Sequence, residues 1–233
     1  MTGDSAPRQL PLDLVHAPAL GRDDFLVGGC NEAALALVDR WPDWPSRVAV
    51  IIGPADAGKS HLAAIWAMAT GASVVAAREL TPAAVVALPE MPALVVEDID
   101  DPALDEVALF HLMNLARERG TWLLLTSRVA PTALSPRIAD LGSRLRAATP
   151  VELSEPDDDF LRRLLVKLLA DRQLAVEPAV VDYIVLRMER SPDAASRIVA
   201  RLDSEALAAR RRITRPMAAD VLRALGASGA GDD

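Results

Sequence analysis

The sequence has very few of the residues that build disulfide-linked or metal-binding proteins. Cys30 is the one cysteine among 233 residues, so neither a disulfide framework nor a thiolate metal cluster can form within the chain. The three histidines lie far apart, without the spacing of metal ligands: His16, His61 and His111. A chain without disulfides is typical of a reducing compartment, so we expect a cytoplasmic protein.

Long apolar runs are also lacking. The longest uncharged apolar run, Leu62 to Ala77, is too short to span a bilayer comfortably and contains Gly71. The first residues do not show the basic segment followed by an apolar segment that marks a secretory signal. We therefore predict no membrane partner.

Positive charge is scarce relative to negative charge. The 25 Lys and Arg residues stand against 33 Asp and Glu, which gives a net charge of -8 and a pI near 5.0. Such a chain has no overall positive field to attract it to nucleic acid. The triplet Arg210 to Arg212 is more typical of surface charge that compensates a helix dipole than of a DNA site. We predict no direct sequence-specific DNA binding.

Short apolar runs do occur, and they are separated by stretches of helical length. With 51% hydrophobic and 25% charged residues, the chain can bury a full core. Apolar strands that alternate with helices predict an α/β fold with a five-stranded parallel sheet covered on both faces. After Leu153 the sequence shows helical periodicity without further strand candidates, which predicts a small all-helical domain. The expected strands are RVAVIIG, ASVVAA, PALVVED, TWLLLTS and TPVEL.

The stretch GPADAGKS matches the phosphate-binding pattern G-x-x-x-x-G-K-[ST], between an expected strand and an expected helix. Gly53 and Gly58 allow backbone N–H groups to face phosphate oxygens, and Lys59 adds a positive charge for the outer phosphates. Ser60 is the expected ligand of a magnesium ion. A glycine turn with a solvated lysine is the alternative, and it treats the motif and its flanks as coincidence. The predicted nucleotide contacts here are Gly53, Pro54, Ala55, Asp56, Ala57, Gly58, Lys59, Ser60 and His61.

A second part of the site is predicted at the end of the strand PALVVED. In P-loop ATPases, an acidic residue at the end of a neighbouring strand holds magnesium through water, and the next carboxylate polarises the attacking water. Glu97 and Asp98 occupy these two places. The alternative is that EDIDDPALDE is an acidic solvated loop. Four apolar residues leading directly into adjacent carboxylates favour the site.

Four segments, in their order and spacing, resemble the AAA+ module of the bacterial replication initiator DnaA and, more closely, its shortened relative Hda: DDFLVGGCNEAALAL, GKSHLAAIW, LLLTS and DLGSRL. The resemblance extends from Phe25 to about Leu225. It implies an AAA+ fold that binds ADP or ATP, with Mg²⁺, between the sheet domain and a helical lid. It also implies that the linker from Phe25 to Asn31, including Val27, borders the adenine.

The resemblance suggests four segments of chain. We expect an N-terminal tail with a binding peptide over 1–22, the AAA+ α/β domain over 23–153, the lid over 154–226 and a flexible tail over 227–233. DnaA continues beyond its lid into a helix-turn-helix domain that reads the origin, and we expect none here.

The resemblance also implies a role for Arg144, in DLGSRL, on a neighbouring molecule. In this family the matching arginine projects from one subunit into the nucleotide of the next. A planar, permanently charged guanidinium suits the negative charge that develops on a transferred γ-phosphoryl group. From the residues alone, Arg144 could equally cap a helix or pair with Asp140.

Three positions depart from the family pattern in the parts that read or cleave a γ-phosphate. Glu97 stands where the family usually has Asp, Arg128 where DnaA has an acidic sensor, and Asp193 where the lid usually has a sensor arginine. Arg197 lies one turn further along and is a candidate substitute. We expect intact nucleotide binding and, at best, weak intrinsic ATP hydrolysis.

The N-terminal stretch QLPLDL predicts a binding peptide. Pro11 biases the chain toward an extended form, in which alternate side chains point the same way. Hda proteins carry a similar peptide that docks on the DNA polymerase sliding clamp, although Asp13 stands where that peptide often has proline. A peptide packed against its own domain is the alternative. The expected clamp contacts are Gln9, Leu10, Leu12 and Leu14.

The combined prediction is an adenine-nucleotide-bound regulator of chromosomal replication initiation. It would dock on the β sliding clamp of DNA polymerase III and offer Arg144 to the ATP of DnaA, which would stimulate hydrolysis and prevent over-initiation. The short peptide alone binds weakly, so a homodimer or a second surface would be needed for firm attachment. The main alternative is an autonomous AAA+ ATPase of the DnaA or helicase-loader type. A small-molecule kinase would use the same loop but has no acceptor motif here.

Overall fold

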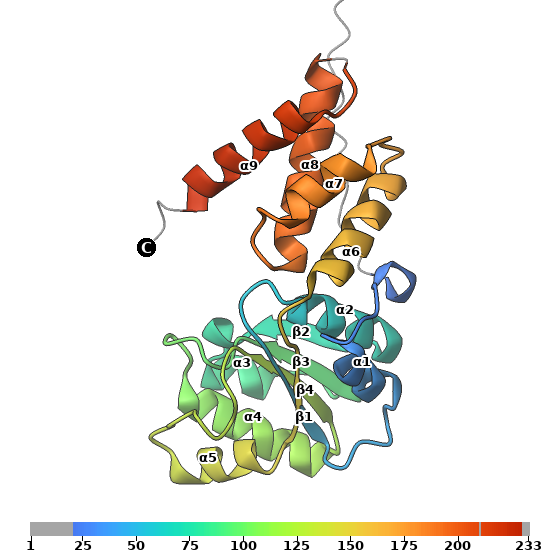
Figure 1. The fold of residues 1–233 in the computed structure, drawn as a ribbon. Helices are drawn as coiled ribbons and strands as arrows, with labels where there is room; N and C mark the ends of the chain where they lie inside the picture. Colours follow the sequence, from blue (N-terminus) through green and yellow to red (C-terminus); the bar gives the residue numbers. More distant parts are fainter. Residues whose placement is uncertain (1–20, 210, 230–233) are drawn as a thin grey trace, which may run out of the picture.

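The fold is described from a computed structural model, which describes residues 21–209 and 211–229, with side chains as far as residue 226. Its sheet domain contains five parallel strands in the order β2-β3-β4-β1-β5 (Figure 1). This parallel sheet confirms the fold predicted from the five apolar runs. The strands are β1 (Val48–Ile52), β2 (Ser73–Ala76), β3 (Ala93–Glu97), β4 (Trp122–Ser127) and β5 (Thr149–Glu152).

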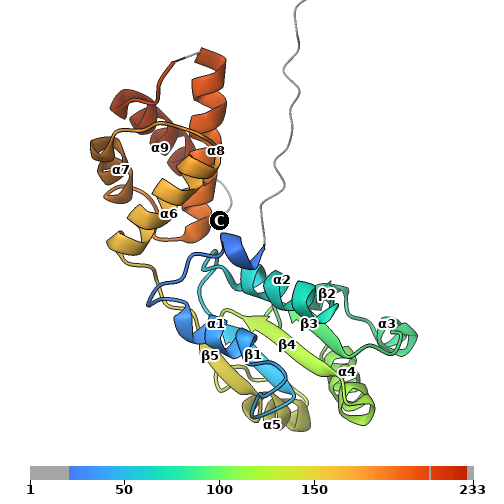
Figure 2. The same cartoon turned by 90° about the vertical axis from the view of Figure 1, so that its right-hand side faces the viewer.

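The central strands are buried on both faces because helices cover each side of the sheet (Figure 2). In β1, Ala49 and Ile51 pack with α1 (Glu32–Asp39) and α2 (Lys59–Thr70), whereas Val50 and Ile52 belong to the core on the opposite face. The alternation follows from the pleat of a strand, which turns successive side chains to opposite faces. The helices on the opposite face are α3 (Pro82–Ala87), α4 (Glu106–Arg119) and α5 (Ala139–Arg146), and two short 3-10 helices are η1 (Arg22–Asp24) and η2 (Ala77–Glu79).

The lid is a separate helical domain with its own hydrophobic core. Two elements of chain connect it with the sheet domain, namely the link from β5 to α6 and the linker that precedes α1 (Figures 1 and 2). Leu26 and Cys30 of this linker pack against the lid core, while Phe25 packs against the core beneath α1 and α2. The linker therefore contacts both domains. The lid helices are α6 (Asp158–Asp171), α7 (Pro178–Val185), α8 (Pro192–Ala209) and α9 (Arg215–Gly229).

The last helix is longer than the sequence pattern suggests. Residues 227–229 were predicted to begin a flexible tail, but α9 continues to Gly229. Gly226 costs a helix about 1 kcal/mol relative to alanine, which weakens the helix without ending it, and no proline follows to stop it.

Across the described ranges, no helix is both long enough and apolar enough to cross a bilayer.

Candidate nucleotide-binding site

The phosphate-binding loop connects the end of β1 to the start of α2. Gly58 has a φ of 96° and Asp56 a φ of 60°, so the loop twice uses the left-handed region before α2 begins at Lys59. At Gly53, a Cβ atom would lie 2.9 Å from the Cβ of Leu153 and 3.0 Å from its carbonyl oxygen. Only glycine allows the loop to approach the end of β5 this closely.

Lys59 is held inside the loop. The residue is 7% exposed, and Nζ donates to the carbonyl oxygens of Gly53 at 2.9 Å and Pro54 at 2.7 Å. Burial lowers the pKa of Lys59, while the nearby charges of Asp98 and Asp100 oppose this shift. The lysine thus lies within the field of the carboxylates that follow β3.

Glu97 and Asp98 stand at the end of β3, as the sequence pattern predicts. The Oε1 atom of Glu97 is buried, and no hydrogen-bond donor reaches it from the described part of the chain. The backbone N–H of Asp98 donates to Oγ1 of Thr126 at 2.9 Å, and its φ of 58° turns the chain sharply at this point. A buried carboxylate oxygen without a donor retains its lone pairs, which fits a divalent cation at this position.

Ser60 and His61 form the first turn of α2. Ser60 is exposed, so its hydroxyl is accessible to a ligand. His61 packs edge-on against Phe25, with ring centroids 5.0 Å apart and an interplanar angle of 87°. Burial lowers the pKa of His61, which favours the neutral imidazole. The linker is therefore packed directly against the start of the helix that carries the loop.

The linker is braced by one side chain. Asn31 Oδ1 accepts the N–H of Gly28 at 2.9 Å, and Asn31 Nδ2 donates to the carbonyl of Leu26 at 2.9 Å. At Gly28, a Cβ would lie 2.4 Å from Cδ2 of Phe160 in α6, so linker and lid touch without room for a larger residue. Val27, between these contacts, is 39% exposed and available to an adenine ring.

Two arginines that the sequence analysis singled out, Arg128 and Arg197, are engaged in ion pairs. Arg128 pairs with Asp100 through Nε at 3.5 Å, and its backbone N–H donates to the same carboxylate at 3.0 Å. Arg197 lies 2.9 Å from Asp193 and 3.2 Å from Glu189. The residue at the expected sensor position therefore pairs with the candidate substitute. Sequence reasoning missed this pair, although i,i+4 spacing of opposite charges on a helix signals it.

Arg144 lies on α5, where two contacts orient it. Its Nε and Nη2 both donate to Oδ2 of Asp140, at 3.0 and 2.9 Å, and its guanidinium lies over the ring of Phe110 in α4, 5.0 Å from the centroid. The pairing with Asp140 was one alternative left open by the sequence, whereas the contact with Phe110 was not predicted. Of the five guanidinium N–H donors, this carboxylate takes two and leaves three.

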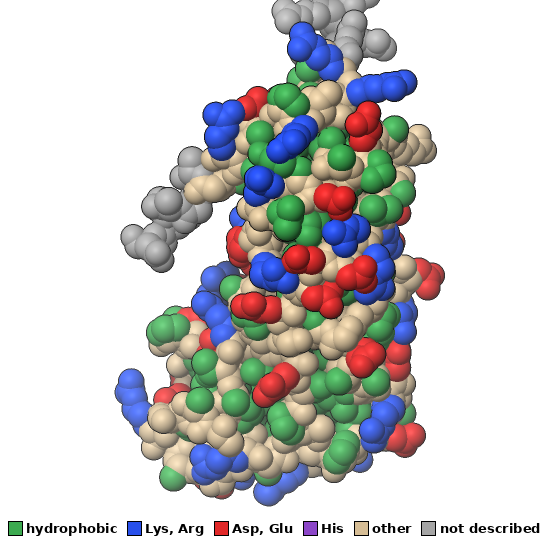
Figure 3. Space-filling view, in the orientation of Figure 1, with side chains coloured by type: hydrophobic (Ala, Val, Ile, Leu, Met, Phe, Trp, Pro, Cys, Tyr) green, Lys and Arg blue, Asp and Glu red, His purple; other side chains and the backbone are tan. Residues whose placement is uncertain are grey.

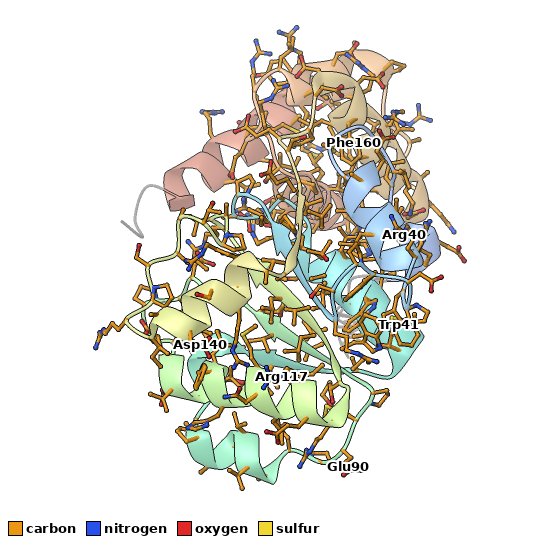
Figure 4. The ribbon with its side chains drawn as sticks, turned by 90° about the horizontal axis from the view of Figure 1, so that it is seen from below. Arg40, Trp41, Glu90, Arg117, Asp140 and Phe160 are labelled. Carbon is orange, nitrogen blue, oxygen red and sulfur yellow. The ribbon has the colours of Figure 1, made fainter. Side chains whose placement is uncertain are left out.

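The position of α5 separates Arg144 from the linker of its own chain. Figure 4 places Asp140 and Phe160 on opposite sides of the view, with Asp140 on α5 and Phe160 where the lid meets the linker. Arg144 is one turn from Asp140 and is 22% exposed. Arg144 therefore lies on the α5 side of the sheet domain, away from the contact between lid and linker.

The comparisons with known proteins agree with this architecture. Residues 158–222 match the family model described as "Hda, lid domain". A Haemophilus influenzae Rd protein described as uncharacterized is 27% identical over 118 residues, which are 50% of this chain and 51% of that protein. The chain thus spans about half the length of this curated relative.

Solved structures show the same fold at low sequence identity. Domain III of the Thermotoga maritima replication initiation protein DnaA has a TM-score of 0.71 at 17% identity, covering 89% of this chain and 97% of that one. The Thermotoga maritima RuvB Holliday junction branch migration motor has a TM-score of 0.65 at 20% identity, covering 84% and 67%. AMPPCP-bound DnaA from Aquifex aeolicus has a TM-score of 0.63 at 19% identity, covering 79% and 65%.

These matches confirm the predicted AAA+ fold and the predicted relationship. The matches to DnaA domain III and RuvB cover 89% and 84% of this chain, and the family model covers most of the lid. The chain thus has the AAA+ fold of DnaA domain III, and its lid is similar to the lid domain of Hda.

Proposed function

We propose that this protein is an adenine-nucleotide-binding regulator of chromosomal replication initiation that stimulates ATP hydrolysis by DnaA. The observation that carries the proposal is a difference in how its arginines are paired. Arg128 and Arg197 are paired with carboxylates of their own chain. Arg144, on α5, lies over the Phe110 ring and donates only two of its five N–H groups to Asp140. Such a chain is better equipped to act on a partner's nucleotide than on its own.

ADP or ATP is the proposed ligand of the loop. The loop's left-handed turns and the buried cation of Lys59 favour a phosphate chain, and the helix dipole of α2 adds to this. The Aquifex aeolicus neighbour was solved with AMPPCP, a nucleotide analogue, which favours the same ligand class here.

Ser60 and Glu97 are the proposed holders of Mg²⁺, which would neutralise phosphate charge when bound. The accessible hydroxyl of Ser60 and the donor-free buried oxygen of Glu97 suit an oxygen-ligated cation. Asp98, with its exposed carboxylate, is the proposed acceptor for a proton of the attacking water.

In the proposed mechanism, Arg144 supplies positive charge to the γ-phosphate of ATP bound by DnaA. Asp140 and Phe110 restrict the guanidinium before the partner arrives, so less conformational entropy is lost on contact. Arginines supplied in this way to a neighbouring active site are worth about 10³ to 10⁵ in rate.

The matched test compares Arg144→Ala with Arg146→Ala. Both residues lie on α5 and both changes remove one positive charge, but Arg146 is exposed and bonds only Ser143 among its described neighbours. We expect Arg144→Ala to reduce stimulation of DnaA's ATP hydrolysis by at least about a hundredfold, and Arg146→Ala to leave it within about twofold. Stimulation that survives the loss of Arg144 would contradict the proposal.

Docking on the β sliding clamp of DNA polymerase III is the second part of the proposal. The peptide with Gln9, Leu10, Leu12 and Leu14 lies outside the described residues, so its support is the sequence pattern alone. Changing Gln9 and Leu12 together to alanine should abolish capture by immobilised clamp and leave the melting temperature unchanged. If the peptide instead packs on its own domain, truncating Leu12 should cost about 2 to 5 kcal/mol of stability.

An autonomous AAA+ ATPase, as the RuvB likeness would allow, makes a different prediction. We expect the isolated protein to hydrolyse ATP below about 1 s⁻¹, the lower end of common enzyme rates. A single-turnover measurement with magnesium and no partner decides between the two. A faster rate would favour the motor.

A further inference from the structure

One flank of the lid carries four exposed arginines with no carboxylate partner in the part of the chain that the structure describes. They are Arg187, Arg211, Arg212 and Arg215, which we call the arginine flank. The other described arginines of the lid pair with carboxylates, as in Arg162–Asp182 and Arg172–Asp203. In a chain with a net charge of -8, this concentration of uncompensated positive charge is unusual.

Tertiary packing brings the four residues around the first turn of α9. The guanidinium carbons of Arg187 and Arg215 lie 4.1 and 4.6 Å from the centroid of the Tyr183 ring in α7. Arg211 and Arg212 belong to the connection from α8 to α9, a few residues before Arg215. The amino terminus of α9 adds its own partial positive charge.

A groove lined by both charged and apolar residues adjoins these cations. A cavity of about 560 Å³ lies between α8 and α9 and is lined in part by Arg211 and Arg212. Its carboxylates are already engaged, since Glu205 pairs with Arg201 at 2.8 Å and Asp220 pairs with Arg223. Apolar side chains on the α9 side of the groove are Pro216, Met217 and Val221.

The surface view agrees with this distribution of charge. On the face shown in Figure 3, Lys and Arg side chains are spread over the upper part of the lid with acidic ones among them, and acidic side chains are denser, interspersed with Lys and Arg, nearer the sheet domain. A long anion could therefore contact the outer part of the lid without crossing the most acidic area of this face.

We propose that the arginine flank binds the phosphate backbone of DNA without reading its sequence. All four cations are arginines, whose planar fork matches phosphate oxygens and whose weak hydration makes ion pairing less costly than for lysine. They are spread over the ends of three helices, so a linear chain of phosphates can engage several of them at once. This binding goes beyond the proposed function, because it requires neither nucleotide, clamp nor DnaA.

The test is fluorescence anisotropy of a short labelled duplex with the full chain at several salt concentrations. Four phosphate contacts predict a slope of log K against log salt of about -4, so affinity should fall about a hundredfold between about 50 and about 200 mM salt. Arg211→Gln with Arg212→Gln, and separately Arg187→Gln with Arg215→Gln, should each weaken binding about tenfold and reduce the slope by about 2.

The control is Arg40→Gln with Arg119→Gln, which removes the same charge from exposed positions of the sheet domain. Melting temperatures confirm that all variants are folded. No binding of the parent protein at low salt would overturn the proposal, as would equal loss in the control and in the two flank variants. Equally tight binding of a labelled poly-glutamate peptide, lost in the same variants, would also overturn it in favour of an acidic protein partner.

Discussion

At the scale of single residues, the charged groups of the candidate site are held by contacts within the chain. Lys59 donates to two loop carbonyls, and Arg197 is paired with two carboxylates. Exposed ion pairs contribute only about 0.2 to 1 kcal/mol, so the pairing of Arg197 is easily broken by a stronger ligand. The buried position of Lys59 is a firmer restraint, since moving it to solvent would take the donor from the buried carbonyl of Gly53 and the partly buried one of Pro54.

Lys59→Ala tests the phosphate loop. The change removes the loop's own cation aimed at the outer phosphates, so we expect the affinity for ADP and ATP to fall at least tenfold, or about 1.4 kcal/mol. Equilibrium titration with a fluorescent nucleotide measures this, and circular dichroism of the variant controls for folding. An affinity within about twofold of the parent would exclude the loop as the nucleotide site.

Asp140→Ala tests whether the ion pair positions Arg144. The guanidinium would keep its contact with Phe110 but lose the carboxylate that fixes its rotation. We expect maximal stimulation of DnaA's ATPase to fall about tenfold, while the protein concentration that gives half-maximal stimulation stays the same. Asp140→Glu should recover part of the loss.

Asp159→Ala serves as the control for this change, because it breaks a similar i,i+4 pair with Arg163 in the lid. Faster stimulation by Asp140→Ala would show that Asp140 restrains the arginine instead of positioning it.

At the scale of elements, the linker decides how the two domains meet. Phe25, at its start, packs under α1 and α2, and Gly28, in its middle, packs on Phe160 of α6. Asn31 holds the turn between them with two hydrogen bonds, each worth about 1 kcal/mol. The binding of a nucleotide bordered by the linker would therefore depend on the position of the lid.

Gly28→Ala tests this contact between elements. The new methyl group would overlap the ring of Phe160, so we expect a loss of about 1 to 3 kcal/mol in the free energy of unfolding. In a Phe160→Leu background the same change should cost less, because the overlapping ring edge is gone. Urea unfolding of the parent, the two single variants and the double variant gives the coupling free energy between Gly28 and Phe160.

Gly29→Ala is the matched control, since no atom of the described residues, apart from its chain neighbours, lies within 4 Å of a Cβ at that position. Its free energy of unfolding should stay within about 0.5 kcal/mol of the parent. Equal losses of unfolding free energy at both glycines would show that stability depends on the linker backbone itself and not on its contact with α6.

At the scale of the molecule, the sheet domain and the lid have separate hydrophobic cores, and tryptophan fluorescence comes from the sheet domain alone. All four tryptophans lie in the sheet domain, and each contacts two of the others, with ring centroids 5.2 to 6.4 Å apart. The lid has its own core of α6 to α9 and contains no tryptophan. Tryptophan fluorescence therefore reports on the sheet domain, whereas far-UV circular dichroism reports on both.

Comparing these two signals tests the coupling of the domains. Without nucleotide, we expect the fluorescence and circular dichroism midpoints in urea to differ, since each domain has a separate core. Saturating ADP should raise both midpoints and bring them together, because a ligand held by both domains stabilises only their joined state. Coincident curves without nucleotide would contradict the expectation.

The sequence by itself determined the elements and the place of the loop. The five strands were readable because an apolar run of β-branched and leucine residues between helical stretches is a local pattern. Gly53, Gly58 and Lys59 were found for the same reason, since the geometry that a phosphate demands of a backbone is met within eight consecutive residues. The lid followed from helical periodicity alone.

Only the tertiary structure decided which distant side chains meet. Arg144 rests on Phe110 of another helix, Gly28 meets Phe160 across the domain boundary, and Tyr183 lies beneath arginines from two elements. Local propensity carries no information about such contacts, because they depend on how helices pack after the chain has folded. The same packing gathered separate exposed arginines into one flank, and so produced a charged surface that the net charge of the sequence conceals.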